Sequence, residues 1–185
     1  VCLIKGLRCN LVIETHSMFC GSMWYDIKFS SYLPRIYRMV DRVVSLSQVD
    51  VEFWKNYAPT YFIPNPIDCI SRKNISNNYN SQNIIWVGRL AEEKNPYAIL
   101  EAFSIVHNEL PSATLTIVGD NDDPSWMRGL QERANHLNIE QNVEFCGYEL
   151  EIGEYYQMAS IFAMTSSSES FSMVLAESKE YGLPA

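Results

Sequence analysis

The stretch that decides the fold is IIWVGRLAEEKNPY, Ile84–Tyr97. An apolar run ends in a glycine, a charged loop follows, and Asn95 and Pro96 then introduce a segment with helical spacing. The apolar run predicts a buried strand. Asparagine is a favoured helix cap and proline suits the first helical position, so the pair indicates a helix start. The stretch therefore predicts a strand–loop–helix unit.

The same alternation continues on both sides of this stretch. Apolar runs predict strands over residues 11–15, 42–47, 60–64, 84–88, 113–119, 143–145 and 160–166. Segments with helical spacing predict helices over residues 29–40, 49–57, 95–109, 124–137, 152–159 and 170–181. Continuous apolar strands that alternate with helices indicate a parallel sheet covered on both faces. The predicted fold class is α/β, with Rossmann-like parallel sheets that bind ligands at the carboxyl ends of their strands.

A polar segment rich in Asn and Ser divides this pattern. We expect residues 1–66 to form the end of an N-terminal domain, residues 67–83 a linker, and residues 84–185 most of a second domain. Three strands before the linker make a poor independent sheet. The chain also stops at GLPA, where a turn into a further strand is expected. These features predict a fragment of two linked α/β domains.

Composition narrows the class of protein. The 185 residues are 47% hydrophobic, which suffices for one core or for parts of two. The net charge of −8, without a dense basic stripe, argues against nucleic-acid binding. The five cysteines are scattered without a CxxC pair, which argues against a disulfide framework and against zinc. A reduced, cytoplasmic chain fits best. No apolar run approaches the ~20 residues that span a bilayer.

Two cations stand near the predicted start of the helix over residues 95–109. Lys94 lies at the positive end of the helix dipole, where its charge is unfavourable, and Arg89 lies on the same loop. This arrangement indicates a bound anion, most simply a phosphate, which the backbone at Gly88 could approach closely. The alternative is that Glu92 and Glu93 neutralise both cations on a solvated loop. The stretch alone leaves both interpretations open.

A second stretch, SSSESFSMVLAE at 166–177, carries two carboxylates separated by seven residues. Ser166 and Glu169 have the spacing of a capping box, which is the simpler interpretation of Glu169. That interpretation does not explain Glu177, which lies off the expected apolar face. The face itself would consist of Phe171, Val174, Leu175 and Ser178. A continuous helix would separate the carboxylates by roughly 12 Å, about the span from sugar to ribose in a sugar nucleotide. Free amides between them could hold a diphosphate.

These segments resemble a known family. VGRLAEEKN, TIVGD, VEFCGY, SSSESFSMVLAE and YGLPA occur in the order and spacing of the retaining, GT-B-fold glycosyltransferases of family four, the glycosyl transferases group 1. IETHS and IPNPID resemble the end of that family's N-terminal domain. The resemblance covers nearly the whole chain and is strongest over residues 84–185. Each motif alone is weak, but five in register are highly specific.

The resemblance implies a function and a set of roles. A sugar would move from a nucleotide-diphosphate sugar to a hydroxyl of a saccharide or lipid-linked acceptor, in cell-surface polysaccharide or glycolipid synthesis, without a metal or other cofactor. Glu169 would face the transferred sugar, and His16 matches a histidine that reaches this sugar from the opposite domain. A strand-end histidine with local hydrogen bonds is the simpler interpretation of His16.

The resemblance also assigns the donor-binding residues. Arg89 and Lys94 would bind the diphosphate, and Glu177 would bind the ribose hydroxyls. The main chain at Tyr148 would meet the nucleobase, and backbone groups of 171–174 would meet the phosphates and the sugar. The full expected donor-binding set is Gly88, Arg89, Lys94, Tyr148, Ser170, Phe171, Ser172, Met173, Val174 and Glu177.

The sequence departs from the family at two points. Ser170 and Ser172 stand where the family often has glycine, which narrows the space above the backbone and adds hydroxyls, so donor choice could change. The family's glycine-rich loop near its N-terminus and its closing helices are missing, so we expect this chain by itself to be inactive. Two alternatives remain. One is a sugar-nucleotide epimerase of the same fold, which lacks the E-x7-E spacing, and the other is a non-catalytic sugar-nucleotide-binding domain.

A cluster of basic residues suggests a second surface. Lys28, Arg35, Arg38 and Arg42 could form a basic face. The resemblance implies that such a face can meet an anionic membrane or acceptor, which would give peripheral association at the inner face of the cytoplasmic membrane. A solvated helix face is the interpretation that the charge pattern favours.

Overall fold

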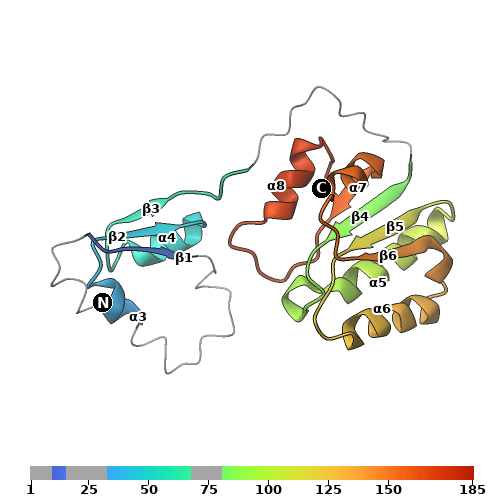
Figure 1. Ribbon diagram of the computed structural model, residues 1–185, viewed down its shortest axis with the longest axis horizontal. Helices are drawn as coiled ribbons and strands as arrows, with labels where there is room; N and C mark the ends of the chain where they lie inside the picture. Colours follow the sequence, from blue (N-terminus) through green and yellow to red (C-terminus); the bar gives the residue numbers. More distant parts are fainter. Residues whose placement is uncertain (1–9, 16–32, 68–80) are drawn as a thin grey trace. The chain divides into compact units, whose positions relative to one another are not determined.

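The computed structural model describes residues 10–15, 33–67 and 81–185. The chain divides into two compact units (Figure 1). The first comprises Val1–Pro66 with Ser168–Ser172, and the second comprises Ile67–Ser167 with Met173–Ala185. The expected linker and domain boundaries stay a prediction, and residues 68–80 of that linker lie outside the described residues.

The first unit contains a parallel sheet with the strand order β1-β2-β3. Its elements are β1 (Val12–Thr15), α3 (Leu33–Tyr37), β2 (Arg42–Ser45), α4 (Gln48–Trp54) and β3 (Thr60–Phe62). Its core forms where Trp54 of α4 stacks on Tyr37 at a centroid distance of 3.8 Å. The expected strands are confirmed. The expected helix over 29–40 is shorter among the described residues, since α3 ends at Tyr37 and residues 29–32 are not described.

The second unit contains a parallel sheet with the strand order β6-β5-β4-β7. Its strands are β4 (Asn83–Val87), β5 (Thr114–Val118), β6 (Val143–Gly147) and β7 (Ile161–Ala163). Its helices are η2 (Glu92–Lys94), α5 (Pro96–Glu109), α6 (Ser125–His136), η3 (Glu140–Asn142), α7 (Gly153–Met158) and α8 (Met173–Glu180). The prediction of an α/β unit with a parallel sheet is confirmed.

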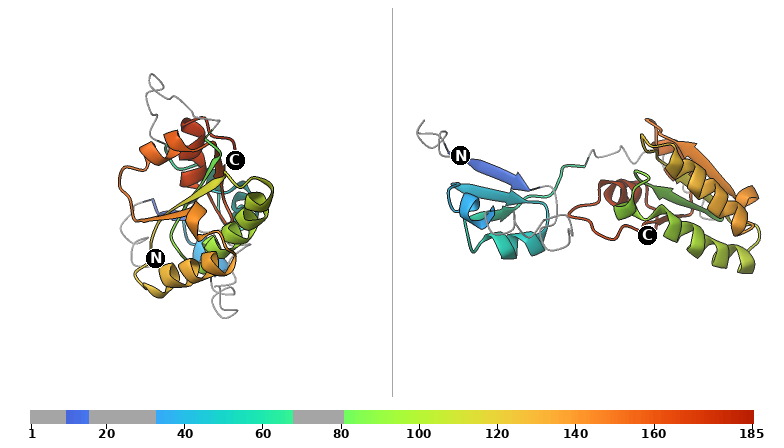
Figure 2. Two further views of the ribbon diagram at one scale, coloured as in Figure 1. Left: turned by 90° about the vertical axis from the view of Figure 1, so that its right-hand side faces the viewer. Right: turned by 90° about the horizontal axis from the view of Figure 1, so that it is seen from below.

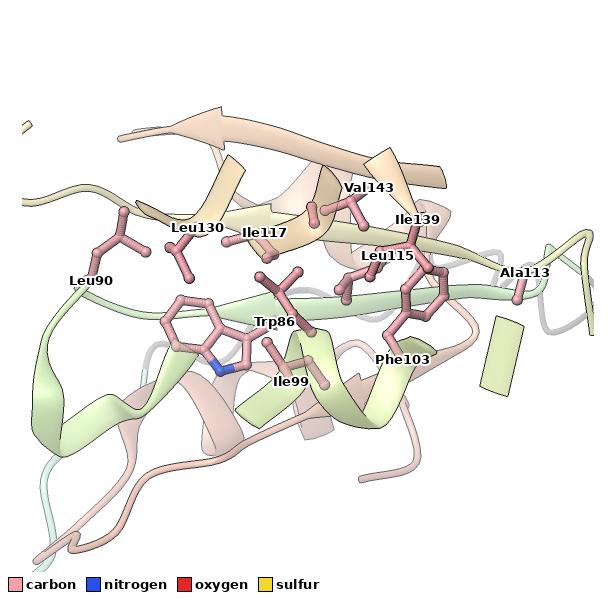
Figure 3. Close-up of a cluster of buried hydrophobic side chains, with 12 residues drawn as sticks. Trp86, Leu90, Ile99, Phe103, Ala113, Leu115, Ile117, Leu130, Ile139 and Val143 are labelled. Atoms are coloured by element: carbon pink, nitrogen blue, oxygen red, sulfur yellow. The ribbon is translucent and has the colours of Figure 1, made fainter. Parts of the chain in front are cut away.

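Strand β4 shows why both faces of this sheet are covered. Successive side chains of a strand point to opposite faces. Trp86 accordingly packs with α5 and α6, and Figure 3 shows its ring among Ile99, Ile117 and Leu130. Ile85 belongs to a second buried cluster, with residues of α7, α8 and β7. Figures 1 and 2 show these helix pairs on opposite sides of the sheet. Because both faces of β4 are buried, its sequence is a continuous apolar run.

The strand order creates a switch point between β4 and β7. The chain passes from β4 through β5 to β6, and then returns to place β7 on the other edge of β4. Two loops leave the sheet there, 88–95 after β4 and 164–172 after β7. Open parallel sheets bind ligands outside the carboxyl ends of their strands at such a point. We call these segments the β4 loop and the β7 loop.

The predicted start of the last helix is wrong. Helix α8 begins at Met173, so Glu169 precedes the helix and cannot close a capping box with Ser166. The continuous helical rise from Glu169 to Glu177 is wrong for the same reason. Phe171 likewise precedes the helix and has no place on its face. Val174 and Leu175 do pack against the second cluster, and Ser178 is buried. Serine favours caps and turns over helix interiors, and the serines at 166–172 keep this segment non-helical.

Candidate functional site

A cleft of about 1150 Å³ lies at the carboxyl ends of β4 and β5. Its lining comes from the ends of these strands, from the start of α6, and from the segment that follows β6. The lining residues are Val87, Gly88, Arg89, Val118, Gly119, Asp120, Asn121, Asp122, Pro124, Met127, Tyr148, Glu149 and Ile152. The cleft thus occupies the edge of the sheet where the strand pattern predicted ligand binding.

Glycines at the strand ends leave bare backbone in this cleft. Gly119 has φ +141°, and a Cβ placed on it would lie 1.8 Å from the carbonyl oxygen of Gly88. The amide of Gly88 donates to the carbonyl of Val118 at 3.0 Å, and the amide of Gly119 donates to that of Gly147 at 2.7 Å. Gly88 was predicted, whereas Gly119 was missed although it carries the same signal of a glycine after an apolar strand.

Arg89 lines the cleft and forms an ion pair with Glu93 four residues on. This ion pair neutralises the charge of Arg89, as expected from the alternative interpretation in which Glu92 and Glu93 neutralise the two cations of a solvated loop. A hydrogen bond from its own backbone and the neighbouring Arg89 guanidinium both lower the pKa of Glu93 below its usual value. The Arg89 side chain is 67% exposed, so the pair is a surface ion pair. Such pairs contribute about 0–1 kcal/mol, and a competing anion can displace them.

Lys94 ends the short helix η2, and Asn95 joins it to α5. Pro96 occupies the first turn of α5, as predicted. Asn95 occupies the N-cap position of α5, as predicted, although its side chain makes no cap hydrogen bond. The physical reason is its backbone, because Asn95 adopts the left-handed region with φ +48°. A capping side chain requires an extended backbone instead.

Hydrogen bonds fasten the β4 loop to the β7 loop. Thr165 Oγ1 lies 2.9 Å from the carbonyl oxygens of both Lys94 and Asn95. The amide of Ser167 donates to the carbonyl of Glu93 at 2.9 Å, and its hydroxyl lies 3.2 Å from the same oxygen. Residues 165–167 at the start of the β7 loop are therefore hydrogen-bonded to the backbone of residues 93–95 of the β4 loop.

Three acidic residues also line the cleft. Asp120, Asp122 and Glu149 contribute carboxylates, and Tyr148 contributes a ring that is 72% exposed. The amide of Leu90 donates to the carbonyl of Asp120 at 3.0 Å, which ties the ends of β4 and β5 together. Tyr148 was predicted and the carboxylates were missed. The signal for Asp120 was its position directly after the strand-ending glycine of TIVGD.

Glu177 lies on α8 against a buried tyrosine. The hydroxyl of Tyr156 donates towards Oε2 of Glu177 at 3.4 Å and lies 3.3 Å from the carbonyl of Val174. Burial and the nearby charge of Glu177 raise the pKa of Tyr156 well above its ordinary value. The Tyr156 hydroxyl therefore stays neutral and remains a hydrogen-bond donor. The side chain of Glu177 is held against this buried tyrosine.

The predicted site residues fall into four groups. Gly88, Arg89 and Tyr148 line the cleft, and Lys94 lies on the adjoining β4 loop. Helix α8 of the second unit carries Met173, Val174 and Glu177. Glu169, Ser170, Phe171 and Ser172 belong to the first unit. His16 lies outside the described residues, so its assignment stays a prediction.

The described residues contain neither a metal-binding cluster nor a membrane-spanning helix. Within residues 10–15, 33–67 and 81–185, no three His, Cys, Asp or Glu side chains gather as a metal-binding group. In the same residues, no helix combines the length and the apolar character needed to cross a membrane. Of the predicted basic face, Arg35, Arg38 and Arg42 are exposed, and Arg38 lies over the ring of Tyr57 at 5.4 Å. Lys28 lies outside the described part of the chain.

Known proteins resemble this chain in sequence. Residues 70–185 match the family model of glycosyl transferases group 1. The amylovoran biosynthesis glycosyltransferase AmsD of Erwinia amylovora is 30% identical over 161 residues, which cover 80% of this chain and 43% of that protein. An uncharacterized glycosyltransferase of Haemophilus influenzae is 26% identical, over 78% of this chain and 40% of that protein. The chain therefore spans about two fifths of the length of these relatives.

Solved structures share the fold. Anabaena HepE, solved in complex with UDP, superposes with a TM-score of 0.82 at 20% identity, over 97% of this chain and 53% of that one. TarM of S. aureus superposes with a TM-score of 0.81 at 14% identity, over 95% of this chain and 36% of that one. The fold is that of the GT-B glycosyltransferases. The family match covers more than half of the residues, and the chain belongs to the glycosyl transferases group 1 family.

Proposed function

We propose that the protein is a retaining glycosyltransferase that moves a sugar from a nucleotide-diphosphate sugar to a hydroxyl acceptor. The observation that carries this proposal is the cleft at the carboxyl ends of β4 and β5, where bare glycine backbone lies beside Arg89, together with the adjoining loop that carries Lys94 and is hydrogen-bonded to Thr165. Its volume of about 1150 Å³ suits a ligand of nucleotide size. Membership of the family supports the reaction class.

Arg89 and Lys94 would bind the donor diphosphate. Glu93 holds Arg89 through an exposed ion pair, so a diphosphate could replace the carboxylate at little cost. The guanidinium can donate two parallel hydrogen bonds to a phosphate, and the pair of cations would stabilise the charge that develops on the departing diphosphate. This electrostatic role needs no metal. The cations at the start of α5 are thus explained by an anion that arrives with the substrate.

Helix α8 would supply the second part of the donor site. Its first turn, at Met173 and Val174, has amides that can meet a phosphate. Glu177 would accept hydrogen bonds from the ribose hydroxyls, and the packed Tyr156 hydroxyl would help to fix its rotamer. The main chain at Tyr148 would meet the nucleobase. In this proposal the two carboxylates of the E-x7-E motif keep separate roles, Glu169 at the sugar and Glu177 at the ribose.

The sugar would lie against the segment before α8. Glu169 would position the sugar and stabilise positive charge on it, while the acceptor hydroxyl attacks on the face from which the diphosphate departs. The backbones of Ser170, Phe171 and Ser172 would line the same region, and the serine hydroxyls would add hydrogen bonds that glycines lack. His16 keeps its role at the donor sugar as part of this proposal.

The relatives suggest the setting and the first nucleotide to test. HepE was solved with UDP, and the pneumococcal O-GlcNAc transferase GtfA with UDP and GlcNAc. AmsD is named for biosynthesis of amylovoran. We therefore place the protein in polysaccharide or glycolipid assembly, with a saccharide or lipid-linked acceptor. The scattered cysteines favour the cytoplasm. The basic face that includes Arg35, Arg38 and Arg42 would meet the inner face of the membrane.

Titration of Lys94→Ala with nucleotides tests the phosphate site. Calorimetry with UDP, GDP and ADP first identifies the nucleotide that the protein binds. Because charged hydrogen bonds contribute about 1.5–3 kcal/mol, we expect Lys94→Ala to weaken that diphosphate by roughly 10- to 100-fold. The matching nucleoside should bind as before.

Lys179→Ala is the matched control, since it removes the same charge from an exposed position in the last turn of α8. It should leave both affinities unchanged. Equal losses for diphosphate and nucleoside in Lys94→Ala would contradict the phosphate site. Sugar transfer by a longer chain, with the anomeric configuration of the product read by NMR, would test the retaining reaction against a non-catalytic binding role.

A further inference from the structure

We propose that Thr165 is a positioning residue, whose hydroxyl holds residues 93–95 so that Lys94 and Arg89 meet the donor diphosphate in a fixed arrangement. This inference rests on the proposed function and adds a residue to it. Thr165 lies on the β7 loop, outside the residues that line the cleft, and neither the strand pattern nor the family motifs singled it out.

The hydrogen bonds around Thr165 fix the direction of its hydroxyl proton. The indole Nε1 of Trp86 lies 2.9 Å from Thr165 Oγ1. An indole N–H can only donate, so the threonine oxygen accepts this bond. The single proton of the hydroxyl is then available for the carbonyl oxygens of Lys94 and Asn95, each 2.9 Å away. Thr165 therefore connects Trp86 to the backbone of the phosphate loop.

Trp86 is itself held firmly. It is 2% exposed and lies in the cluster between β4, α5 and α6 (Figure 3). A Cβ placed on Gly88 would lie 3.2 Å from its ring, so the strand end also packs tightly against the indole. The hydrophobic core therefore fixes the position of Thr165 through Trp86, and Thr165 in turn fixes the backbone of Lys94 and Asn95.

The backbone of Asn95 is the point at which this hydroxyl acts. Its φ of +48° lies in the left-handed region, which is uncommon for a residue other than glycine although asparagine tolerates it better than most. Within the loop its amide donates to the carbonyls of Ala91 and Glu92, each at 3.1 Å, whereas its side chain makes no cap hydrogen bond. Unusual backbone conformations persist when surrounding contacts impose them, and they concentrate at functional sites. Here the hydroxyl of Thr165 makes that contact at the carbonyl of Asn95.

A second contact makes the role separable from folding. The amide of Ser167 donates to the carbonyl of Glu93 at 2.9 Å, and a substitution at position 165 leaves that backbone bond in place. Glu93 in turn pairs with Arg89. Removal of the Thr165 hydroxyl should therefore keep the two loops together but loosen the segment that presents Lys94.

The test compares Thr165→Val with Thr165→Ser. Valine has nearly the shape of threonine but no hydroxyl, and serine keeps the hydroxyl. Calorimetric titrations with UDP, GDP and ADP, and with the nucleoside of the one that binds, give both affinities. Valine removes both the bond that Thr165 accepts from Trp86 and the bond that it donates to the loop carbonyls, and only the second reaches the phosphate loop. Since that second bond contributes about 1 kcal/mol, we expect Thr165→Val to weaken the diphosphate by about fivefold, with the nucleoside unchanged. Thr165→Ser should restore the wild-type affinity.

Ser104→Ala is the control for the loss of a hydroxyl outside the cleft. Ser104 donates from its hydroxyl to the carbonyl of Glu101 at 2.7 Å within α5, so the variant deletes the same kind of bond away from the cleft. It should leave the affinities for the diphosphate and the nucleoside unchanged, and since alanine is the better helix former its urea midpoint should not fall. The proposal is overturned if Thr165→Val binds the diphosphate as the wild type does, or loses diphosphate and nucleoside equally. A wild-type protein that binds none of the three diphosphates would overturn the donor site and this role together, whereas normal wild-type binding with an unaffected Thr165→Val overturns this role alone.

Discussion

At the scale of single residues, Gly119 and Gly147 differ in the space that surrounds them. Both have positive φ, +141° and +72°. A Cβ at Gly119 would lie 1.8 Å from the carbonyl oxygen of Gly88, whereas a Cβ at Gly147 would meet no atom within 4 Å. We expect Gly147→Ala to lower the free energy of unfolding by about 1 kcal/mol through its backbone alone, and Gly119→Ala by at least about 3 kcal/mol.

Urea unfolding of the two variants measures this difference. The pair is matched, because both glycines end neighbouring strands of one sheet and both substitutions add a single methyl group. A similar midpoint for the two variants would mean that the backbone at Gly88 moves aside easily. The bare backbone of the cleft would then not be a rigid surface for a ligand.

Single residues could be predicted where the residue type and its place beside a strand or helix indicate a role. A glycine after an apolar run identified Gly88, and a cation before a helix start identified Lys94. Thr165 could not be found this way, because its role depends on contact with Trp86, which lies 79 residues earlier in the chain. The sequence around Thr165, a serine-rich segment, does not indicate that contact. A residue that acts by positioning a neighbouring residue can be recognised only when the fold is known.

At the scale of elements, the end of α8 makes a testable case. The amide of Gly182 donates to the carbonyl of Lys179 at 2.9 Å, and that of Leu183 donates to Ser178 at 3.0 Å. With Gly182 at φ +74° and Leu183 buried, this is a Schellman motif. Gly182→Ala should lower the free energy of unfolding by about 1 kcal/mol. Gly182→Asn should lower it less, because asparagine tolerates this conformation. Unfolding midpoints that rank alanine above asparagine would contradict the assignment.

The two ends of α8 also show why element boundaries differ in predictability. The sequence YGLP contains one residue suited to the left-handed turn, so the predicted end at 181 lies one residue from the observed end at Glu180. The start lies in a segment with serines at 166, 167, 168, 170 and 172, each of which can cap a helix. Several starts were therefore equivalent by sequence, and the predicted start at 170 was three residues too early.

At the scale of the whole molecule, the alternation of strands and helices was sufficient to predict parallel sheets, because parallel neighbours need crossover connections. The pattern did not predict which strands are adjacent. β7 pairs with β4 and not with β6, which precedes it in the chain. That single reversal creates the switch point and brings the β4 loop and the start of the β7 loop together, an arrangement that the pattern leaves open.

The two units should unfold separately. Among the described residues, the first unit buries five apolar side chains in one cluster beneath a 3-stranded sheet. The second buries twelve and six side chains on the two faces of a 4-stranded sheet. Because stability grows with buried apolar area, the first unit should unfold at a lower urea concentration.

Hydrogen exchange followed by mass spectrometry resolves the two transitions. At intermediate urea, the amides of β2 should exchange while those of β5 stay protected. A bound nucleotide diphosphate should shift protection of β5 to higher urea, because a ligand that binds the folded state of the second unit stabilises that unit by mass action. Loss of protection in both strands at one urea concentration would contradict separate units. A nucleotide that binds but shifts only β2 would place its site outside the cleft of the second unit.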